Sequence, residues 1–367
     1  MNVSSQNRFL VVIIGVLFVV LIGLLVFRFV SVGTEIDPDS LSLTEEPSLE
    51  TPSESEAAET EWPLMFTTMT HMEGSWDMAA TDEGFFSRQA GLLRTAMDYA
   101  EMYDAVLTFE TEIPFAEGMV NFNDNVFQEA LDRGMGIGTH CDIGPQRRLS
   151  TEGIIQEFLE RKQAVDVLVD ANENLGCAGG GGRSDWYEGA VGAGFVYISG
   201  MVGFHYLAMP ASLRPEGWSD QVILEEYYHH PAPVEDALRY YPFRVSDASF
   251  NEDTTGRLVV SAGDIGEVSS IGDLNGENGW NAACGQDCEV KQDDVDAIVE
   301  AIRNFDAIRD RSRPAKMQVY IPSQKYSDEG IELFFEALQE LQEDGVIQWA
   351  SQKEVYETFL AWEVAAL

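Results

Sequence analysis

The longest apolar run in the chain lies near its start. From Phe9 to Phe27 no residue is charged, and the apolar stretch continues past Arg28 to Val30. A helix needs about 20 apolar residues to cross the hydrocarbon core of a bilayer. A cleaved signal peptide is the alternative, but its apolar region is typically about 7–15 residues and ends on small residues. Since this run is longer and no Ala-x-Ala sequence follows, the pattern favours an uncleaved transmembrane anchor over residues 9–30.

The charges around this run predict its orientation. Residues 1–8 carry Arg8 and the terminal amine but no acidic residue, and beyond Arg28 no Lys or Arg occurs before Arg88. Positively charged flanks stay in the cytoplasm. We therefore expect a single-pass membrane protein with residues 1–8 in the cytoplasm and the bulk of the chain outside it.

The segment that follows is a poor candidate for a folded structure. Residues 35–62 are rich in Asp, Glu, Pro and Ser and hold no basic residue. Such a composition buries too little apolar surface to offset its ordering entropy, and like charges keep it extended. Residues 31–62 are therefore predicted to form a disordered acidic linker.

Beyond residue 62, short apolar runs alternate with stretches of helical periodicity, which predicts strands followed by helices. Residues 151–176 show one apolar helical face, with Gly176 as the expected stop. The expected strands are residues 63–71, 105–110, 135–140, 195–200, 257–263, 316–322 and 346–351. The expected helices are residues 83–103, 123–134, 151–176, 184–194, 292–311, 328–345 and 352–363. About seven strand–helix units in roughly 300 residues predict one α/β domain over residues 63–367, a closed or nearly closed parallel barrel.

Polar side chains gather at the ends of these strands, where the chemistry of such barrels is found. Residues i and i+2 of an extended strand point the same way, so two polar residues at this spacing can serve one centre. The two imidazoles and two carboxylates of His71/Glu73 and His140/Asp142 suit Zn²⁺, Mn²⁺ or a similar ion. The pairs are His71/Glu73, Glu110/Glu112, His140/Asp142 and Arg183/Asp185.

Several stretches, among them "FNDNVFQEALDRGMGIGTHCDIG", "GGGGRSDWYEGAVGAGFVYISG" and "GIELFFEALQELQEDGVIQWASQKEVYETF", together resemble polysaccharide deacetylases of the NodB-homology type. The resemblance implies an irregular (β/α)7-type barrel that hydrolyses acetyl groups on carbohydrate, with a divalent metal held by one Asp and two His. In "THMEG", Met72 stands at the position of the family's base and Glu73 at that of a metal ligand. In "HCDIG", His140 matches a ligand, whereas Gly144 stands where a second His belongs.

These patterns define the predicted site and its alternatives. The expected ligands are His140 and Glu73, joined by His71 or Asp142. Asp185 or Glu110 is the expected base, with Glu112 as a further candidate, and Arg183, which resembles the family's motif arginine, is the partner of the base. Two other functions stay open. One is an inactive barrel that binds surface glycan or a protein. The other is a metal-free glycosidase that uses paired carboxylates such as Glu110 and Asp185.

Composition and charge limit the kinds of partner that the chain can bind. The net charge of −41 argues against nucleic acid and anionic lipid surfaces. Cys284 and Cys288 could form a short-loop disulfide or a two-thiolate metal clip, while Cys141 and Cys177 are expected to be small buried residues. The four glycines of "GCAGGGGRSDW" lack the ending of a phosphate-binding loop and predict close backbone packing at a strand end.

Overall fold

The computed structural model describes residues 61–72, 76–227, 239–269 and 289–366. The predicted anchor, the predicted linker up to residue 60, and Cys284 and Cys288 lie outside these residues. Among the helices within them, none has both the length and the apolar character to cross a bilayer. The anchor and its orientation therefore stay predictions.

Strands and helices alternate along most of the described chain, as the sequence predicts, but three strands follow one another without a helix between residues 243 and 267. Its first half contains β1 (Leu64–Met72), α2 (Trp76–Thr81), α3 (Glu83–Met102), β2 (Thr108–Thr111), α4 (Ile113–Asn121), α5 (Val126–Asp132), β3 (Gly136–His140), α6 (Thr151–Asp166), β4 (Gly176–Ala178), α7 (Trp186–Ala193), β5 (Tyr197–Ser199), η1 (Gly203–Ala208), η2 (Ala211–Leu213) and α8 (Asp220–Glu225). Its second half contains β6 (Phe243–Val245), β7 (Leu258–Ser261), β8 (Asp264–Glu267), α10 (Gln292–Asp306), β9 (Ala315–Tyr320), η6 (Ser323–Ser327), α11 (Ile331–Glu343), β10 (Gln348–Trp349) and α12 (Gln352–Ala365).

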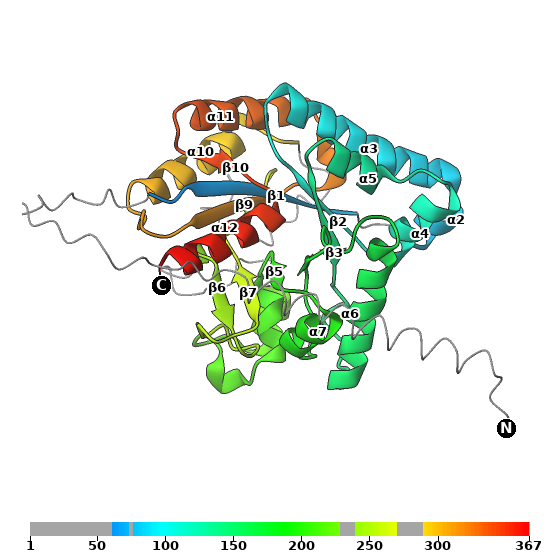
Figure 1. Ribbon diagram of the computed structural model, residues 1–367, viewed down its shortest axis with the longest axis vertical. Helices are drawn as coiled ribbons and strands as arrows, with labels where there is room; N and C mark the ends of the chain where they lie inside the picture. Colours follow the sequence, from blue (N-terminus) through cyan, green and yellow to red (C-terminus); the bar gives the residue numbers. More distant parts are fainter. Residues whose placement is uncertain (1–60, 73–75, 228–238, 270–288, 367) are drawn as a thin grey trace, which may run out of the picture. The chain divides into compact units, whose positions relative to one another are not determined.

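The strands form one sheet in the order β6-β7-β5-β4-β3-β2-β1-β9-β8, with β10 also paired to β1. Every ladder is parallel except β6–β7 among the residues described. β7 leads into β8 through Ala262 and Gly263 alone, although these strands lie near opposite ends of the order. The sheet therefore curves back on itself, which confirms a barrel-like α/β fold with helices outside it (Figure 1).

The alternation of residues along β1 separates two environments. Phe66 points outward, where its ring centroid lies 5.2 Å from that of Trp349 and 6.3 Å from that of Phe334 on α11. Figure 1 shows α3, α10 and α11 on this side of β1 and β9. The outward-pointing residues of β1 thus form part of the apolar core, and the inward-pointing residues can be polar.

The barrel interior holds a hydrogen-bonded polar layer. Gln352 Nε2 donates to Thr67 Oγ1 at 3.1 Å and to Gln318 Oε1 at 2.7 Å. Lys316 Nζ donates to the Ser261 carbonyl at 2.9 Å, and burial lowers the pKa of Lys316 to about 7. Polar groups this deep are retained only when they are paired.

Two predicted helix ends are wrong, since the helix expected over residues 292–311 ends at Asp306. The helix expected over residues 151–176 ends at Asp166, and Gly176 begins β4. The Lys162 side chain bonds the Asn174 carbonyl at 2.8 Å, which folds the intervening segment back against α6. Gly176 is required there because a Cβ would lie 1.8 Å from Cε2 of Tyr197.

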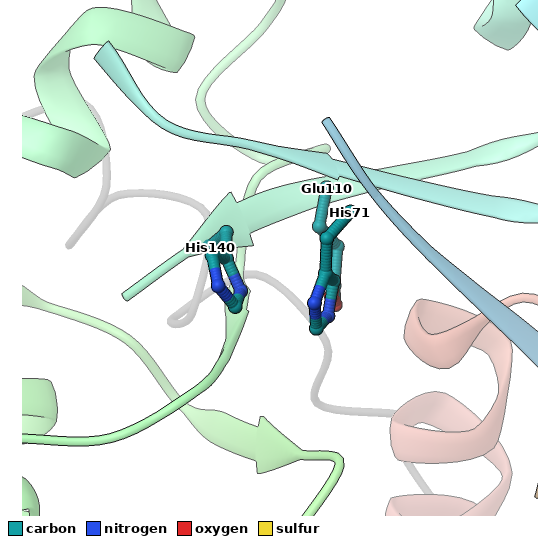
Figure 2. Close-up of side chains that lie close together, drawn as sticks. All are labelled: His71, Glu110 and His140. Carbon is teal, nitrogen blue, oxygen red and sulfur yellow. The ribbon is translucent and has the colours of Figure 1, made fainter. Parts of the chain in front are cut away.

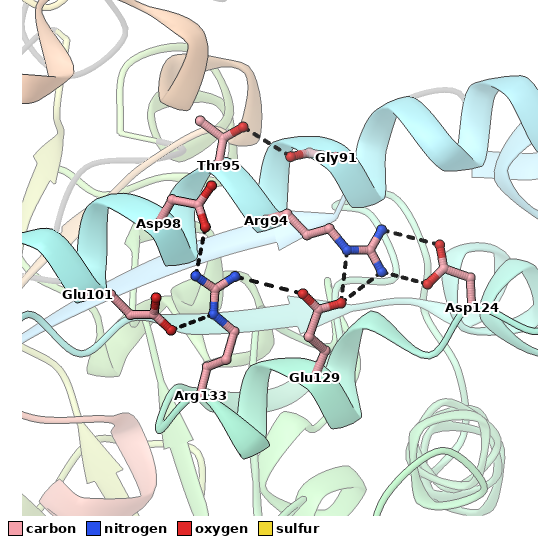
Figure 3. Close-up of polar contacts among 8 residues, drawn as sticks. All are labelled: Gly91, Arg94, Thr95, Asp98, Glu101, Asp124, Glu129 and Arg133. Carbon is pink, nitrogen blue, oxygen red and sulfur yellow. Dashed lines mark hydrogen bonds and ion pairs between the residues drawn. The ribbon is translucent and has the colours of Figure 1, made fainter.

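An ion-pair network on the surface joins α3 to α5 (Figure 3). It uses two of the 22 basic residues to neutralise several of the 63 acidic ones. Arg94 pairs with Asp124 at 2.6 Å and Glu129 at 2.8 Å, and Arg133 pairs with Asp98 at 2.7 Å, Glu101 at 2.6 Å and again Glu129 at 3.7 Å. Because these charges are partly exposed to solvent, each pair contributes at most about 1 kcal/mol to stability.

Candidate metal centre

Three metal-ligating side chains converge at the carboxyl ends of three neighbouring strands. His71 lies on β1, Glu110 on β2 and His140 on β3, and their side chains approach one another (Figure 2). The parallel register pairs His71 with Glu110 and Glu110 with Gly138, two residues before His140. One ligand atom from each side chain lies within 4.8 Å of the others.

The contacts within this cluster are short. His71 Nε2 lies 3.0 Å from Glu110 Oε2, and the two imidazole rings face each other with centroids 3.8 Å apart. Glu110 and His140 are buried, and Ser199 Oγ donates to the other Glu110 oxygen at 3.4 Å. A positive charge stabilises a buried carboxylate flanked by two imidazoles, and a bound divalent cation would supply it.

Glycines make the space for these side chains. A Cβ on Gly138 would lie 3.2 Å from Cγ of Glu110, and one on Gly179 would lie 3.0 Å from Cε1 of His140. Gly179 also has φ of +79°, a conformation that favours glycine. The glycine-rich stretch therefore packs closely against the site, in agreement with its interpretation from the sequence.

The donor set fits a divalent metal. Two imidazole nitrogens and one carboxylate oxygen are ligands that Zn²⁺ and Mn²⁺ accept, and catalytic sites typically use three protein ligands. The three side chains belong to strands, which hold them in place. His71, Glu110 and His140 are thus the residues that would hold the ion.

A further carboxyl group lies beside the cluster. Glu112 follows β2, and its Oε1 accepts from Arg161 Nη1 at 2.9 Å. Burial raises the pKa of Glu112, while Arg161 and nearby His140 act in the opposite direction. Arg161 also donates to the His140 carbonyl at 3.3 Å, so this arginine connects Glu112 to the ligand strand.

The structure brings together only part of the predicted site. His71 and His140 meet as predicted, whereas Glu110, predicted as a base, lies in the ligand cluster. Glu73 lies outside the described residues. Asp142 Oδ1 accepts from the Gly144 N–H at 2.7 Å and closes a turn, so the structure does not bring it into the cluster.

The predicted base and arginine at the fourth strand end have other contacts. Arg183 forms an ion pair with Asp220, which Arg214 also contacts. Asp185 is exposed and caps α7, because its side chain accepts from the Glu188 N–H at 3.1 Å. The structure therefore does not bring either residue into the cluster.

Replacing Asp185 by alanine is expected to destabilise the fold by about 1 kcal/mol, the usual cost of a lost N-cap, and to leave turnover unchanged. Ser150→Ala is the matched control, since Ser150 caps α6 through the Gly153 N–H at 3.2 Å. Urea unfolding and activity measurements on both variants test this. A large loss of activity in Asp185→Ala alone would restore this residue as a catalytic candidate.

His205 also lies in this region, although it was not predicted from the sequence as a site residue. His205 is fully buried on η1, and its Nδ1 lies 3.1 Å from the Val202 backbone nitrogen. A Cβ on Gly180 would lie 2.9 Å from its Nε2, so the glycine stretch packs on this ring too. Burial lowers the pKa of His205, and the imidazole is therefore neutral in the folded chain at neutral pH.

A histidine with a lowered pKa makes stability pH-dependent. The unfolded chain binds more protons than the folded one below about pH 6.5, so this contribution is present above that pH and is lost as the pH falls. His205→Asn is expected to reduce the slope of unfolding free energy against pH by up to about 1.4 kcal/mol per unit between pH 6.5 and 5. Urea unfolding at several pH values measures this, and an unchanged slope would contradict it.

The two described cysteines agree with their prediction. Cys141 and Cys177 are free and buried, and burial raises the pKa of the Cys141 thiol well above its usual range. They are packing residues and not reactive thiols.

No protein-family model matches the chain, and no curated protein matches it. Solved structures do resemble it. They include a putative polysaccharide deacetylase from Mycobacterium smegmatis, at 12% identity and a TM-score of 0.46, covering 88% of this chain and 96% of that one. A 4-alpha-glucanotransferase from Thermococcus litoralis matches at 9% identity and a TM-score of 0.45, covering 80% of this chain and 38% of that one.

A CE4 family pseudoenzyme from Bacillus anthracis also matches, at 9% identity and a TM-score of 0.35, covering 80% of this chain and 65% of that one. Polysaccharide deacetylases, the family that the sequence resembles, are thus among the similar structures. The chain spans about two fifths of the length of the glucanotransferase.

Proposed function

We propose that the chain is a metal-dependent hydrolase that removes acetyl groups from carbohydrate. The observation that carries this proposal is the convergence of His71, Glu110 and His140 at the carboxyl ends of β1, β2 and β3. A divalent ion of the Zn or Mn type, held by these residues, would polarise an acyl oxygen and lower the pKa of a water molecule to about 7. The resemblance to polysaccharide deacetylases supports carbohydrate as the carrier of the acetyl group.

Glu112 is the residue we assign as general base in place of Asp185 and Glu110. Arg161 engages Oε1 of Glu112, so Oε2 would accept the proton of the attacking water. Arg161 pairs with the Glu112 carboxylate and donates to the His140 carbonyl, so it connects this carboxylate to the strand that carries His140. Glu112 is thus proposed as the base, and Arg161 as the arginine partner for which Arg183 was predicted from the sequence.

The surroundings of the site also bear on the substrate. With a net charge of −41, the chain would repel acidic polymers, which favours neutral or amino sugars. The predicted anchor over residues 9–30 and the acidic linker would hold the barrel outside the cytoplasm near the membrane, where surface polysaccharide lies.

Two alternatives differ in their support. An inactive glycan-binding barrel is favoured by Met72 and Gly144, which depart from the family's motifs. A glycosidase using Glu110 and Asp185 is less favoured, because Glu110 lies beside two histidines and Asp185 caps a helix.

Acetate release tests the proposal. The full chain, purified in mild detergent, is stripped with a chelator, reloaded with Zn²⁺ or Mn²⁺ and incubated with N- and O-acetylated neutral oligosaccharides. We expect acetate release from the reloaded protein and none from the stripped one. Oligosaccharide binding without acetate release in the metal-loaded protein would instead support the inactive barrel.

A further inference from the structure

A β-bulge re-aims a carboxyl group at the end of β8. Asp264 pairs with Gln318 of β9, but the next pairs are Gly266 with Val319 and Glu267 with Tyr320, so β8 has one extra residue. The side chain of Asp264 bonds that of Gln318, which points inward. If the side chains of β8 alternated strictly from there, that of Glu267 would point outward. The bulge instead places Glu267 in register with Tyr320.

The burial of the flanking residues agrees with this change of side. Ile265 and Val268 both belong to the outer apolar core. In a regular strand, residues three apart would point to opposite faces. Between them, Gly266 has φ of +130°, which a side chain rarely allows. Bulges are common next to active sites, where they direct a side chain toward the chemistry.

Tyr320 connects this position to the metal centre. It ends β9, pairs with Met69 of β1, and its ring centroid lies 5.1 Å from that of His71. The Val268 N–H donates to the Tyr320 carbonyl at 3.0 Å, which fixes the two strand ends together. Glu267, Tyr320 and His71 therefore follow one another along the same rim of the barrel.

Neighbouring groups hold the Glu267 carboxyl. It is half-buried, and Ser269 Oγ donates to its Oε1 at 2.9 Å. Burial has the largest effect on the pKa of Glu267 and raises it. Ser269 and Lys325 of η6 lower this pKa, and Asp294 of α10 raises it. This fixed, partly desolvated acceptor differs from a surface glutamate with free rotation.

We propose that Glu267 and Tyr320 form a binding subsite for the sugar ring that carries the acyl group. The proposal rests on the function proposed above. With the acetyl group at the His71, Glu110 and His140 cluster, the ring would extend along the rim toward β9 and β8. The Glu267 carboxylate would accept hydrogen bonds from ring hydroxyls, and the Tyr320 ring would pack against the sugar's apolar face. A carboxylate here selects neutral or amino sugars and disfavours uronic acids.

Steady-state kinetics of the full, metal-loaded chain on an acetylated neutral oligosaccharide test the subsite. Glu267→Gln keeps the shape and removes the charge, so we expect KM to rise about 10–100-fold, as for loss of a hydrogen bond to a charged group, with metal content unchanged and kcat changed far less. Tyr320→Leu should also raise KM. Glu300→Gln, an exposed glutamate on α10, is the matched control and should match the wild type. An unchanged KM in Glu267→Gln would overturn the subsite and leave the proposed function intact.

Binding of the unacetylated oligosaccharide, measured by isothermal titration calorimetry, separates the two proposals. If the wild type releases no acetate but binds this sugar, and Glu267→Gln binds it at least about tenfold more weakly, the subsite stands and the hydrolase does not. If the wild type neither binds the sugar nor releases acetate, both are rejected.

Discussion

Replacing His140 by alanine is expected to weaken Zn²⁺ or Mn²⁺ binding by more than about 100-fold and to abolish acetate release. Even residues that only hydrogen-bond to metal ligands typically contribute about 10–100-fold to metal affinity, and His140 itself supplies one of three ligand atoms. The loss also leaves the Glu110 carboxylate beside one imidazole instead of two. Titration of the stripped full chain, followed by elemental analysis, measures the change.

His205→Asn is the matched control for this variant, because His205 is another buried histidine near the same glycine stretch but outside the cluster. It should retain metal and activity. Full retention of the ion by His140→Ala, in a chain that unfolds at the same urea concentration as the wild type, would mean that the ion binds elsewhere.

The second large effect is expected at Glu112. Glu112→Gln preserves the side-chain shape but cannot accept the proton, so kcat should fall about 100–10,000-fold, the usual contribution of a general base. Metal affinity should hardly change, since Glu112 is not in the ligand cluster. Single-turnover acetate release and metal titration on the same preparation measure both quantities.

Glu157→Gln separates catalysis from support of Arg161. Glu157 contacts Arg161 Nη2 at 3.2 Å, so both glutamates pair with the same guanidinium. If Glu157→Gln costs as much activity as Glu112→Gln, the effect arises from the position of Arg161. If Glu112→Gln keeps full activity, another residue is the base.

Much of the fold could be predicted from local patterns. Apolar runs such as that of β9 and amphipathic helices such as α11 are long enough to show their period. β4 could not be predicted, because three residues ending at Ala178 are too few to show alternation. The end of α6 depends on a contact between Lys162 and Asn174, which no local pattern encodes.

The site was predicted to the extent that strand ends are visible in the sequence. His71 and His140 were found in this way. The role of Glu110 depends on the register of β1 against β2, which places it beside His71 and which the sequence does not show. Asp185 carried a local signal that favours a cap: an aspartate three residues before Glu188 at the start of a helix. Glu267 depends on a bulge and was not identified.

A crystal structure of the Zn²⁺-loaded chain, with diffraction recorded on both sides of the zinc absorption edge, tests the metal centre most directly. We predict one strong anomalous peak about 2.0–2.2 Å from a nitrogen of His71, a nitrogen of His140 and a carboxylate oxygen of Glu110. A peak at any other group of side chains, with His71 Nε2 still beside Glu110 Oε2 as in this structure, would contradict this prediction.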